Sequence, residues 1–295
     1  MTVAPIDRRL ALDGIFWRRL AALGARSAPA WFVRWAPPVV GVAVAVASPA
    51  PRRRIAVQLQ RARGSVGKVR GAVDVARTFA NFASCLTEVL STGSKNGRAP
   101  EATVHLARGA KDVLAAGGPV ILATAHTAGW EGMGSLLALQ RTAPVLVVMQ
   151  RERDATAREL SDSKRRAQGG LRIVHVGADP LASLSLLRHL RDGGAVALQI
   201  DRVPAGMSAR AVTLFGRPDA IPEGPLRLAQ LTGAPIVPVF SARTGHRTYE
   251  IHVCDAVTVA RRADDAALGA AAQRLADALG AFVSAHPTQW FPFSR

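Results

Sequence analysis

The strongest constraint on the fold is a repeated alternation of short apolar runs with helical patterns between residues 98 and 295. Apolar runs typical of buried strands occur at 117–125, 145–149, 171–176, 195–200, 211–214, 235–240 and 249–253. Helical patterns occur near 101–115 and at 130–141, 154–168, 180–192, 223–232 and 264–286. Alternation of this kind predicts an α/β fold with a mixed, largely parallel sheet flanked by helices.

The basic charge of the chain is concentrated in its N-terminal third. Of the net charge of +17, residues 1–100 carry most, with 16 Lys and Arg against 4 Asp and Glu. Such a surface attracts nucleic acids or anionic membranes. The sequence has no zinc-finger spacing or RNP-like run and a single tyrosine, so nucleic acid is not the expected partner. We expect this region to face a membrane surface.

The aromatic and apolar residues of the same third support a membrane-facing helical region. Residues 7–35 interleave arginine with tryptophan and phenylalanine, a composition typical of helices in the lipid headgroup layer. The uncharged run 38–48 is shorter than the roughly 20 residues needed to span a bilayer, and prolines and arginines bound it. We therefore predict an interfacial or re-entrant segment there, with an ordinary helical cap as the alternative. A turn-rich linker at 91–97 divides the chain into a basic helical region, 1–97, and an α/β domain, 98–295.

The main catalytic candidate follows the first strong apolar run. His126 comes directly after that run, Gly129 predicts a turn, and Glu131 falls at the start of the next helix. On one continuous helix a five-residue spacing would place the two side chains on different faces, so they meet only across a strand–turn–helix junction. A histidine oriented by a carboxylate is a suitable general base for acyl transfer. Backbone N–H groups at the helix start would then bind the oxyanion.

Neither a nucleophile motif nor a metal motif accompanies this pair. The chain contains no Gly-x-Ser-x-Gly elbow and no Cys/His arrangement, which favours direct attack by an acceptor hydroxyl. The two cysteines, Cys85 and Cys254, have no metal-ligand spacing. We expect neither a metal nor a bound cofactor.

Six blocks follow one another along the chain: His126-Thr-Ala-Gly-Trp-Glu131, Arg151 after the second strand, Asp201-Arg202, Phe215-Gly-Arg217, Gly224-Pro225 with the segment to Phe240, and His286-Pro-Thr-Gln-Trp290. Together these blocks resemble the bacterial lipid A late acyltransferases (lauroyl/myristoyl acyltransferases) of the lysophospholipid acyltransferase superfamily. Mycobacterial phosphatidylinositol mannoside acyltransferases are similar relatives. The chain departs from the family at Val203, where a second acidic residue is usual, and in the shortness of its apolar run at 38–48.

The resemblance implies substrate-binding roles beyond the catalytic pair. Asp201 belongs to a family block, and Arg151, Arg202, Arg210 and Arg217 are suited to holding phosphates of the acceptor or of a phosphopantetheine arm. Solvated loop charge is the alternative for these arginines. Glu223 resembles the acceptor-binding Pro-Glu-Gly block of glycerolipid acyltransferases, and its plain alternative is a carboxylate at a helix start.

The resemblance implies transfer of a fatty acyl chain to a hydroxyl of an anionic membrane glycolipid or lysophospholipid. The donor would be an acyl thioester of acyl carrier protein or coenzyme A, as co-substrate. The expected location is the cytoplasmic face of the bacterial inner membrane, peripheral or monotopic. Two other hypotheses stay open at this point: a non-catalytic anionic-lipid or nucleic-acid binding protein on the same scaffold, and an acyl thioesterase.

Overall fold

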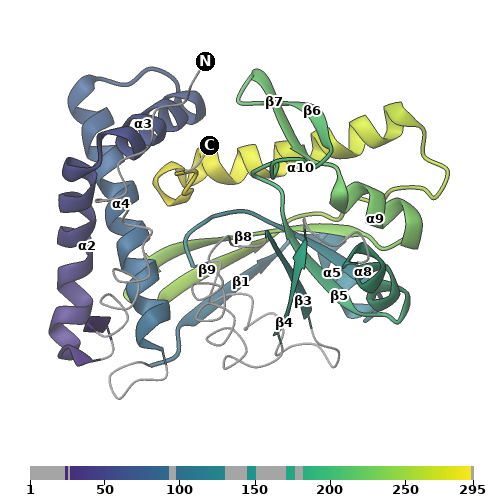
Figure 1. The fold of residues 1–295 in the computed structure, drawn as a ribbon, viewed down its shortest axis with the longest axis horizontal. Coiled ribbons are helices and arrows are strands. Elements are labelled where there is room, and N and C mark those ends of the chain that lie inside the picture. The colour runs from purple at the N-terminus through teal and green to yellow at the C-terminus, as the bar shows by residue number, and fades with distance from the viewer. Residues whose placement is uncertain are drawn as a thin grey trace.

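The computed structural model describes residues 24–25, 27–92, 98–129, 145–150, 171–176 and 182–293. Its centre is a seven-stranded sheet in the order β1-β9-β8-β2-β5-β3-β4 (Figure 1). These strands are β1 (Glu101–Leu106), β2 (Val120–Thr124), β3 (Val145–Gln150), β4 (Leu171–Val176), β5 (Ala195–Gln199), β8 (Ile236–Gly245) and β9 (Thr248–Val253). All neighbouring pairs are parallel except β8 and β9, which form an antiparallel hairpin. The predicted mixed, largely parallel α/β sheet is confirmed.

The two faces of the sheet bury different residues because side chains alternate along each strand. On β2, Ile121 and Ala123 join one hydrophobic cluster, and Val120 and Leu122 join another. The first cluster is covered by α8 (Ala182–Arg191), α9 (Gly224–Thr232) and α10 (Asp265–Ala285). The second receives residues of α5 (Arg108–Ala115). Burial on both sides explains why the central strands are continuous apolar runs in the sequence.

One predicted helix was wrong in part, and one predicted strand lies outside the main sheet. Residues 101–106 form the edge strand β1, with the helix α5 only after it, although we predicted a helix near 101–115. Parallel pairing of β1 with β9 decides this conformation, which overrides the helical preference of Glu101, Ala102 and Leu106. The run at 211–214 belongs to β6 (Ala209–Leu214), which pairs with β7 (Arg217–Pro222) in a separate hairpin and not in the main sheet.

In the described N-terminal part, α2 (Ala30–Ala47), α3 (Pro49–Arg63) and α4 (Lys68–Ser91) lie beside the sheet (Figure 1). We predicted that Pro37 and Pro38 bound a short apolar run, and this was wrong, because α2 continues through both prolines. Pro37 is buried, and α2 packs so closely on α4 that a Cβ on Gly41 would lie 2.4 Å from the Phe79 carbonyl oxygen. This packing compensates the backbone hydrogen bonds that the prolines cannot donate.

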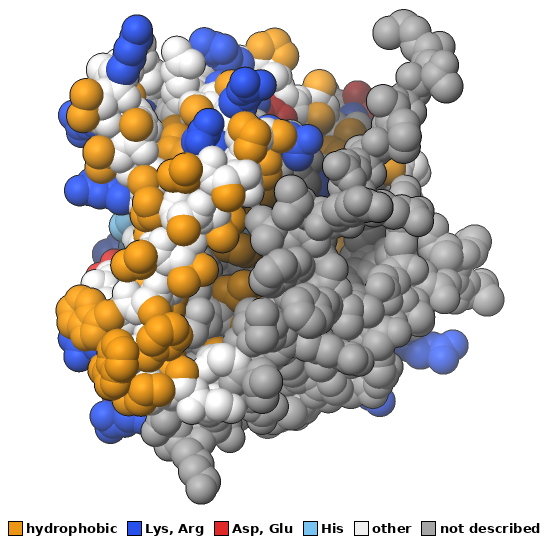
Figure 2. Space-filling model, turned by 60° about the vertical axis from the view of Figure 1, so that its left-hand side comes forward, with side chains coloured by type: hydrophobic (Ala, Val, Ile, Leu, Met, Phe, Trp, Pro, Cys, Tyr) orange, Lys and Arg blue, Asp and Glu red, His pale blue; other side chains and the backbone are white. Residues whose placement is uncertain are grey.

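One face of α2 is an exposed apolar surface (Figure 2). Trp31 and Trp35 are 67% and 64% exposed near the start of the helix, and Val39 and Val46 are 69% and 70% exposed further along. α2 is long and apolar enough to cross a membrane, and only 22% of this stretch is buried within the protein. Of the predicted membrane-facing segment 7–35, most residues lie outside those the structure describes.

Candidate active site

The candidate catalytic histidine lies on a tight turn, residues 125–129, directly after β2. The Thr127 N–H donates to the Ala125 carbonyl (2.7 Å), which folds the chain back as soon as the strand ends. Gly129 has a φ of +79°, a left-handed conformation that favours glycine. A Cβ there would also lie 2.3 Å from the ring of Tyr249. The turn is therefore held in one conformation against β9.

The partner of His126 comes from the neighbouring strand. β5 pairs in parallel with β2, with Thr124 opposite Gln199, so both chains leave the sheet at the same edge. Asp201 follows β5, and its carboxylate oxygens lie 3.0 and 3.2 Å from Nδ1 of His126. The backbone N–H of His126 also donates to Asp201, at 3.2 Å. The carboxylate thus holds both the ring and the main chain of the histidine.

Asp201 is buried, and its charge is nevertheless maintained. Burial by itself would raise the pKa of this carboxyl group, but the His126 charge and hydrogen bonds from His126 and Trp290 lower it to about 2. The indole Nε1–H of Trp290 donates to the carboxylate at 3.0 Å. An ionised Asp201 accepts the proton on Nδ1 of a neutral imidazole, so Nε2 carries the lone pair. The side chain of His126 keeps 21% of its surface exposed, enough for contact with a substrate.

The C-terminal segment closes the turn from the other side. Phe291 donates its N–H to the His126 carbonyl (2.8 Å), and Ala128 donates to the Gln289 carbonyl (2.9 Å). The Gln289 side chain in turn makes two hydrogen bonds with the main chain of Arg243, at 2.6 and 2.9 Å. Gln289 therefore fixes the closing segment to β8, and Trp290 fixes Asp201. The resemblance noted for residues 286–290 is the sequence signal for this clamp.

Comparison with known proteins identifies the scaffold that carries this site. The model of the bacterial lipid A biosynthesis acyltransferase family matches residues 72–295. The chain belongs to this family. It is also 29% identical over 181 residues to phosphatidylinositol mannoside acyltransferases of Mycobacterium tuberculosis strains CDC 1551 / Oshkosh and ATCC 25618 / H37Rv. Each match covers 60% of this chain and 54% of the relative, so the chain spans about half the length of the curated relatives it matches.

Two of the predicted site residues lie outside the part of the chain that the structure describes. Glu131, the carboxylate predicted to orient His126, and Arg151, a predicted phosphate ligand, both belong to this group. Among the described residues, the carboxylate at Nδ1 of His126 is that of Asp201, which we had assigned to substrate binding. At 1% exposure and with its oxygens bonded to His126 and Trp290, Asp201 faces the histidine and the interior.

The remaining predicted site residues are Arg202, Arg210, Arg217 and Glu223. Arg202 follows Asp201 directly and therefore lies beside the histidine turn, partly exposed. Arg210 makes ion pairs with Glu223 (2.8 Å) and Asp265 (2.5 Å), and these contacts hold its pKa above the ordinary value. Arg217 is exposed at the start of β7. Arg210 and Glu223 thus pair with each other. For these two residues, and for Arg202 and Arg217, substrate binding stays a prediction.

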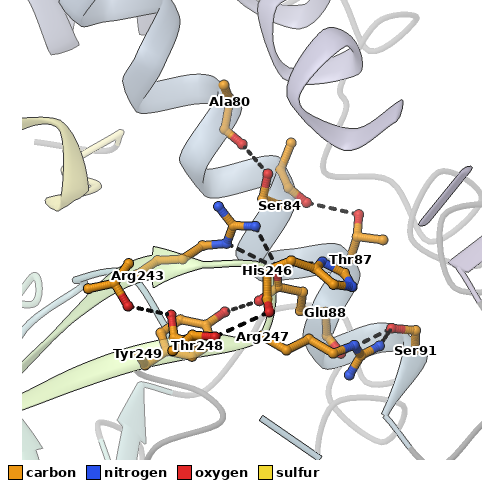
Figure 3. Close-up of polar contacts among 12 residues, drawn as sticks. Ala80, Ser84, Thr87, Glu88, Ser91, Arg243, His246, Arg247, Thr248 and Tyr249 are labelled. Carbon is orange, nitrogen blue, oxygen red and sulfur yellow. Dashed lines mark hydrogen bonds and ion pairs between the residues drawn. The ribbon is translucent and has the colours of Figure 1, made fainter. Parts of the chain in front are cut away.

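A buried polar cluster that sequence reasoning missed ties α4 to the sheet behind the turn (Figure 3). Glu88 is 3% exposed and accepts hydrogen bonds from the Arg243 guanidinium (2.8 and 3.0 Å) and the Tyr249 hydroxyl (2.5 Å). Burial, together with the nearby Cys85 and Glu88, raises the pKa of Tyr249, so its hydroxyl stays protonated and donates. Because the Tyr249 ring packs under Gly129, the cluster supports the histidine turn. The sequence signal for it is Glu88, whose helical spacing places it on the buried face of α4.

The cysteine of this cluster is unsuited to nucleophilic chemistry. Burial and the Glu88 charge raise the pKa of Cys85 to about 12, so the thiolate is not populated near neutral pH. Among the described residues, no group of three or more His, Cys, Asp or Glu side chains is arranged to hold a metal ion.

Proposed function

We propose that this protein transfers a fatty acyl chain from an acyl thioester to a hydroxyl group of a membrane glycolipid or lysophospholipid. The donor is a thioester of acyl carrier protein or coenzyme A, and His126 is the general base. The observation that carries the proposal is the contact between His126 Nδ1 and the buried, ionised Asp201. Family membership supports the reaction class. The mycobacterial relatives, which are phosphatidylinositol mannoside acyltransferases, support a glycolipid acceptor.

In the proposed mechanism the proton follows a direct route. Asp201 holds the proton of His126 on Nδ1, and the Nε2 lone pair removes the proton of the acceptor hydroxyl. The hydroxyl oxygen forms a bond to the thioester carbonyl carbon, and the imidazolium that results is stabilised by Asp201. When the tetrahedral intermediate collapses, the C–S bond breaks. The proton on Nε2 passes to the leaving thiolate, and His126 returns to its neutral form.

The oxyanion of this intermediate needs donors from outside the first part of the turn. The backbone N–H of His126 donates to Asp201, that of Thr127 to Ala125, and that of Ala128 to Gln289. All three are thus already used within the protein. Our expectation that backbone N–H groups after the turn bind the oxyanion concerns residues beyond 129. Arg202, which is adjacent to the carboxylate, is a second candidate because a guanidinium donates directionally to anionic oxygen.

Membrane attachment is part of the proposal. The exposed tryptophans and valines of α2 are suited to the lipid phase, and arginines of α3 follow directly where the helix ends. We expect the protein on the cytoplasmic face of the inner membrane. There it would meet soluble acyl donors and a lipid acceptor together.

The deciding experiment measures transfer of a radiolabelled acyl chain from acyl carrier protein or coenzyme A to total membrane lipid by the full-length protein. The key variant is His126→Asn, because an asparagine amide still donates to Asp201 but removes no proton. We expect a loss of 10²–10⁴-fold in kcat, the usual contribution of a general base, with an unchanged melting temperature. Retained kcat in this variant would refute the mechanism. Labelled free fatty acid without labelled lipid would instead identify a thioesterase.

A further inference from the structure

A basic groove lies between the end of α3 and the start of α4, on elements that do not carry the histidine turn. It is open to solvent and has a volume of about 590 Å³. Four cationic side chains line it, together with Gly67, Val69, Val73 and Asp74; the cations are Arg63, Lys68, Arg70 and Arg77. We call it the α3–α4 groove.

Among the residues that the structure describes, little negative charge compensates the cations of the α3–α4 groove. The buried Asp74 carboxylate is bonded to Arg63 at 2.6 Å, which accounts for one of the four cations. Within the described part of the chain, Lys68, Arg70 and Arg77 make no ion pair. The start of α4 adds to this field, because Gly67 offers no side-chain cap and the first turn contains no acidic residue. Three cations without an ion pair among the described residues, set around a helix start without a side-chain cap, are suited to binding a phosphate group.

The same groove also presents apolar surface. Val69 is 80% exposed and Val73 is 42% exposed, although both are branched aliphatic side chains. Figure 2 shows Lys and Arg side chains at the upper end of this face and hydrophobic side chains running down along α2. A ligand that fits both features carries a phosphate next to hydrocarbon. Nucleic acids and acidic proteins match the charge but leave the valines exposed to water.

We propose that the α3–α4 groove binds the phosphate of an anionic membrane phospholipid, with its acyl chains beside Val69 and the exposed face of α2. This lipid is a bound anchor and not the reacting acceptor. The proposal rests on the groove alone and is independent of the chemistry at His126. It places the α3–α4 end of the helical region at the headgroup layer.

The test compares two variants of the full-length protein with the same change in charge. In the groove variant Lys68, Arg70 and Arg77 become glutamine, and in the control variant residues 52–54 of α3, three exposed arginines, become glutamine. Binding to vesicles of phosphatidylcholine, with or without phosphatidylglycerol, is measured by co-sedimentation. We expect the groove variant to lose about tenfold more affinity for the phosphatidylglycerol vesicles than the control variant does. Equal losses would show diffuse attraction and overturn the site.

Two further measurements identify the ligand class. Vesicles in which a fatty acid replaces phosphatidylglycerol at equal surface charge should bind both variants alike, because the groove recognises phosphate. If the groove variant binds these vesicles as poorly as the phosphatidylglycerol vesicles, phosphate recognition is refuted. Binding of acyl carrier protein in solution is measured in parallel. Its loss in the groove variant with unchanged vesicle binding would assign the groove to the acyl donor and overturn the lipid proposal.

Discussion

Replacing Asp201 with asparagine tests the catalytic arrangement most directly. The carboxylate accepts hydrogen bonds from His126 Nδ1, the His126 main chain and Trp290. An asparagine has one acceptor oxygen and a donor NH₂ group, so it cannot accept all three. If its NH₂ group faces Nδ1, the imidazole must place its proton on Nε2. The lone pair that removes the acceptor proton is then lost.

The size of the effect follows from the interaction energy and the tautomer together. The pKa of Asp201 falls from an ordinary 3.8 to about 2, which corresponds to about 2 kcal/mol of stabilisation of the charged form. If the imidazolium loses a stabilisation of about this size, kcat falls by roughly 30-fold. Loss of the correct tautomer adds to this, and the corresponding aspartate in a serine protease triad is worth about 10⁴-fold. We therefore expect kcat to fall by about 10²–10⁴-fold, with KM little changed.

The assay is steady-state acyl transfer at several pH values, with the melting temperature measured for each variant. Asp219→Asn is the matched control, because Asp219 makes a partly buried ion pair with Arg61 (2.8 Å) away from the histidine turn. The control should keep kcat within a few-fold. A folded Asp201→Asn protein with wild-type kcat and an unchanged pH profile would refute the role of Asp201. In that case the orienting carboxylate would have to be Glu131.

Three further predictions concern the support of the turn and its charge. Glu88→Gln removes the counter-charge of the half-buried Arg243 and should cost about 3 kcal/mol, seen as a lower urea midpoint; an unchanged midpoint would contradict the buried pair. Gly129→Ala places a methyl group against Tyr249 and imposes an unfavourable φ on a residue with a Cβ, so kcat should fall at least tenfold; normal activity would show that the turn is not held as described. The lowered pKa of Asp201 stabilises the fold above about pH 4, and about 2 kcal/mol of the free energy of unfolding should be lost as the pH falls through about 2. In the Asp201→Asn variant the free energy of unfolding should lack this loss. The same decrease at acid pH in both proteins would refute the prediction.

Much of the architecture was predictable because burial on two faces leaves a clear mark in the sequence. Strands β2, β3 and β8 were predicted from continuous apolar runs, and β4, β5 and β9 from apolar runs that polar residues interrupt. The position of His126 at the end of such a run was predictable as well, because the apolar run stops at Ala125 and β2 ends at Thr124. Local rules failed where tertiary contacts outweigh them. Residues 101–106 became a strand because β9 offers a partner, and α2 continues through two prolines because α4 packs against it.

By itself the sequence determined the strand–helix alternation, the histidine at the end of β2 and the family blocks. Only the tertiary structure decided which carboxylate meets His126. Asp201 is 75 residues away and Trp290 a further 89, and no local pattern connects them. The parallel pairing of β2 with β5 brings the two strand ends to one edge, and Gln289 holds the closing segment over them. A contact of this kind depends on the register of the sheet, which is set by the packing of the whole core.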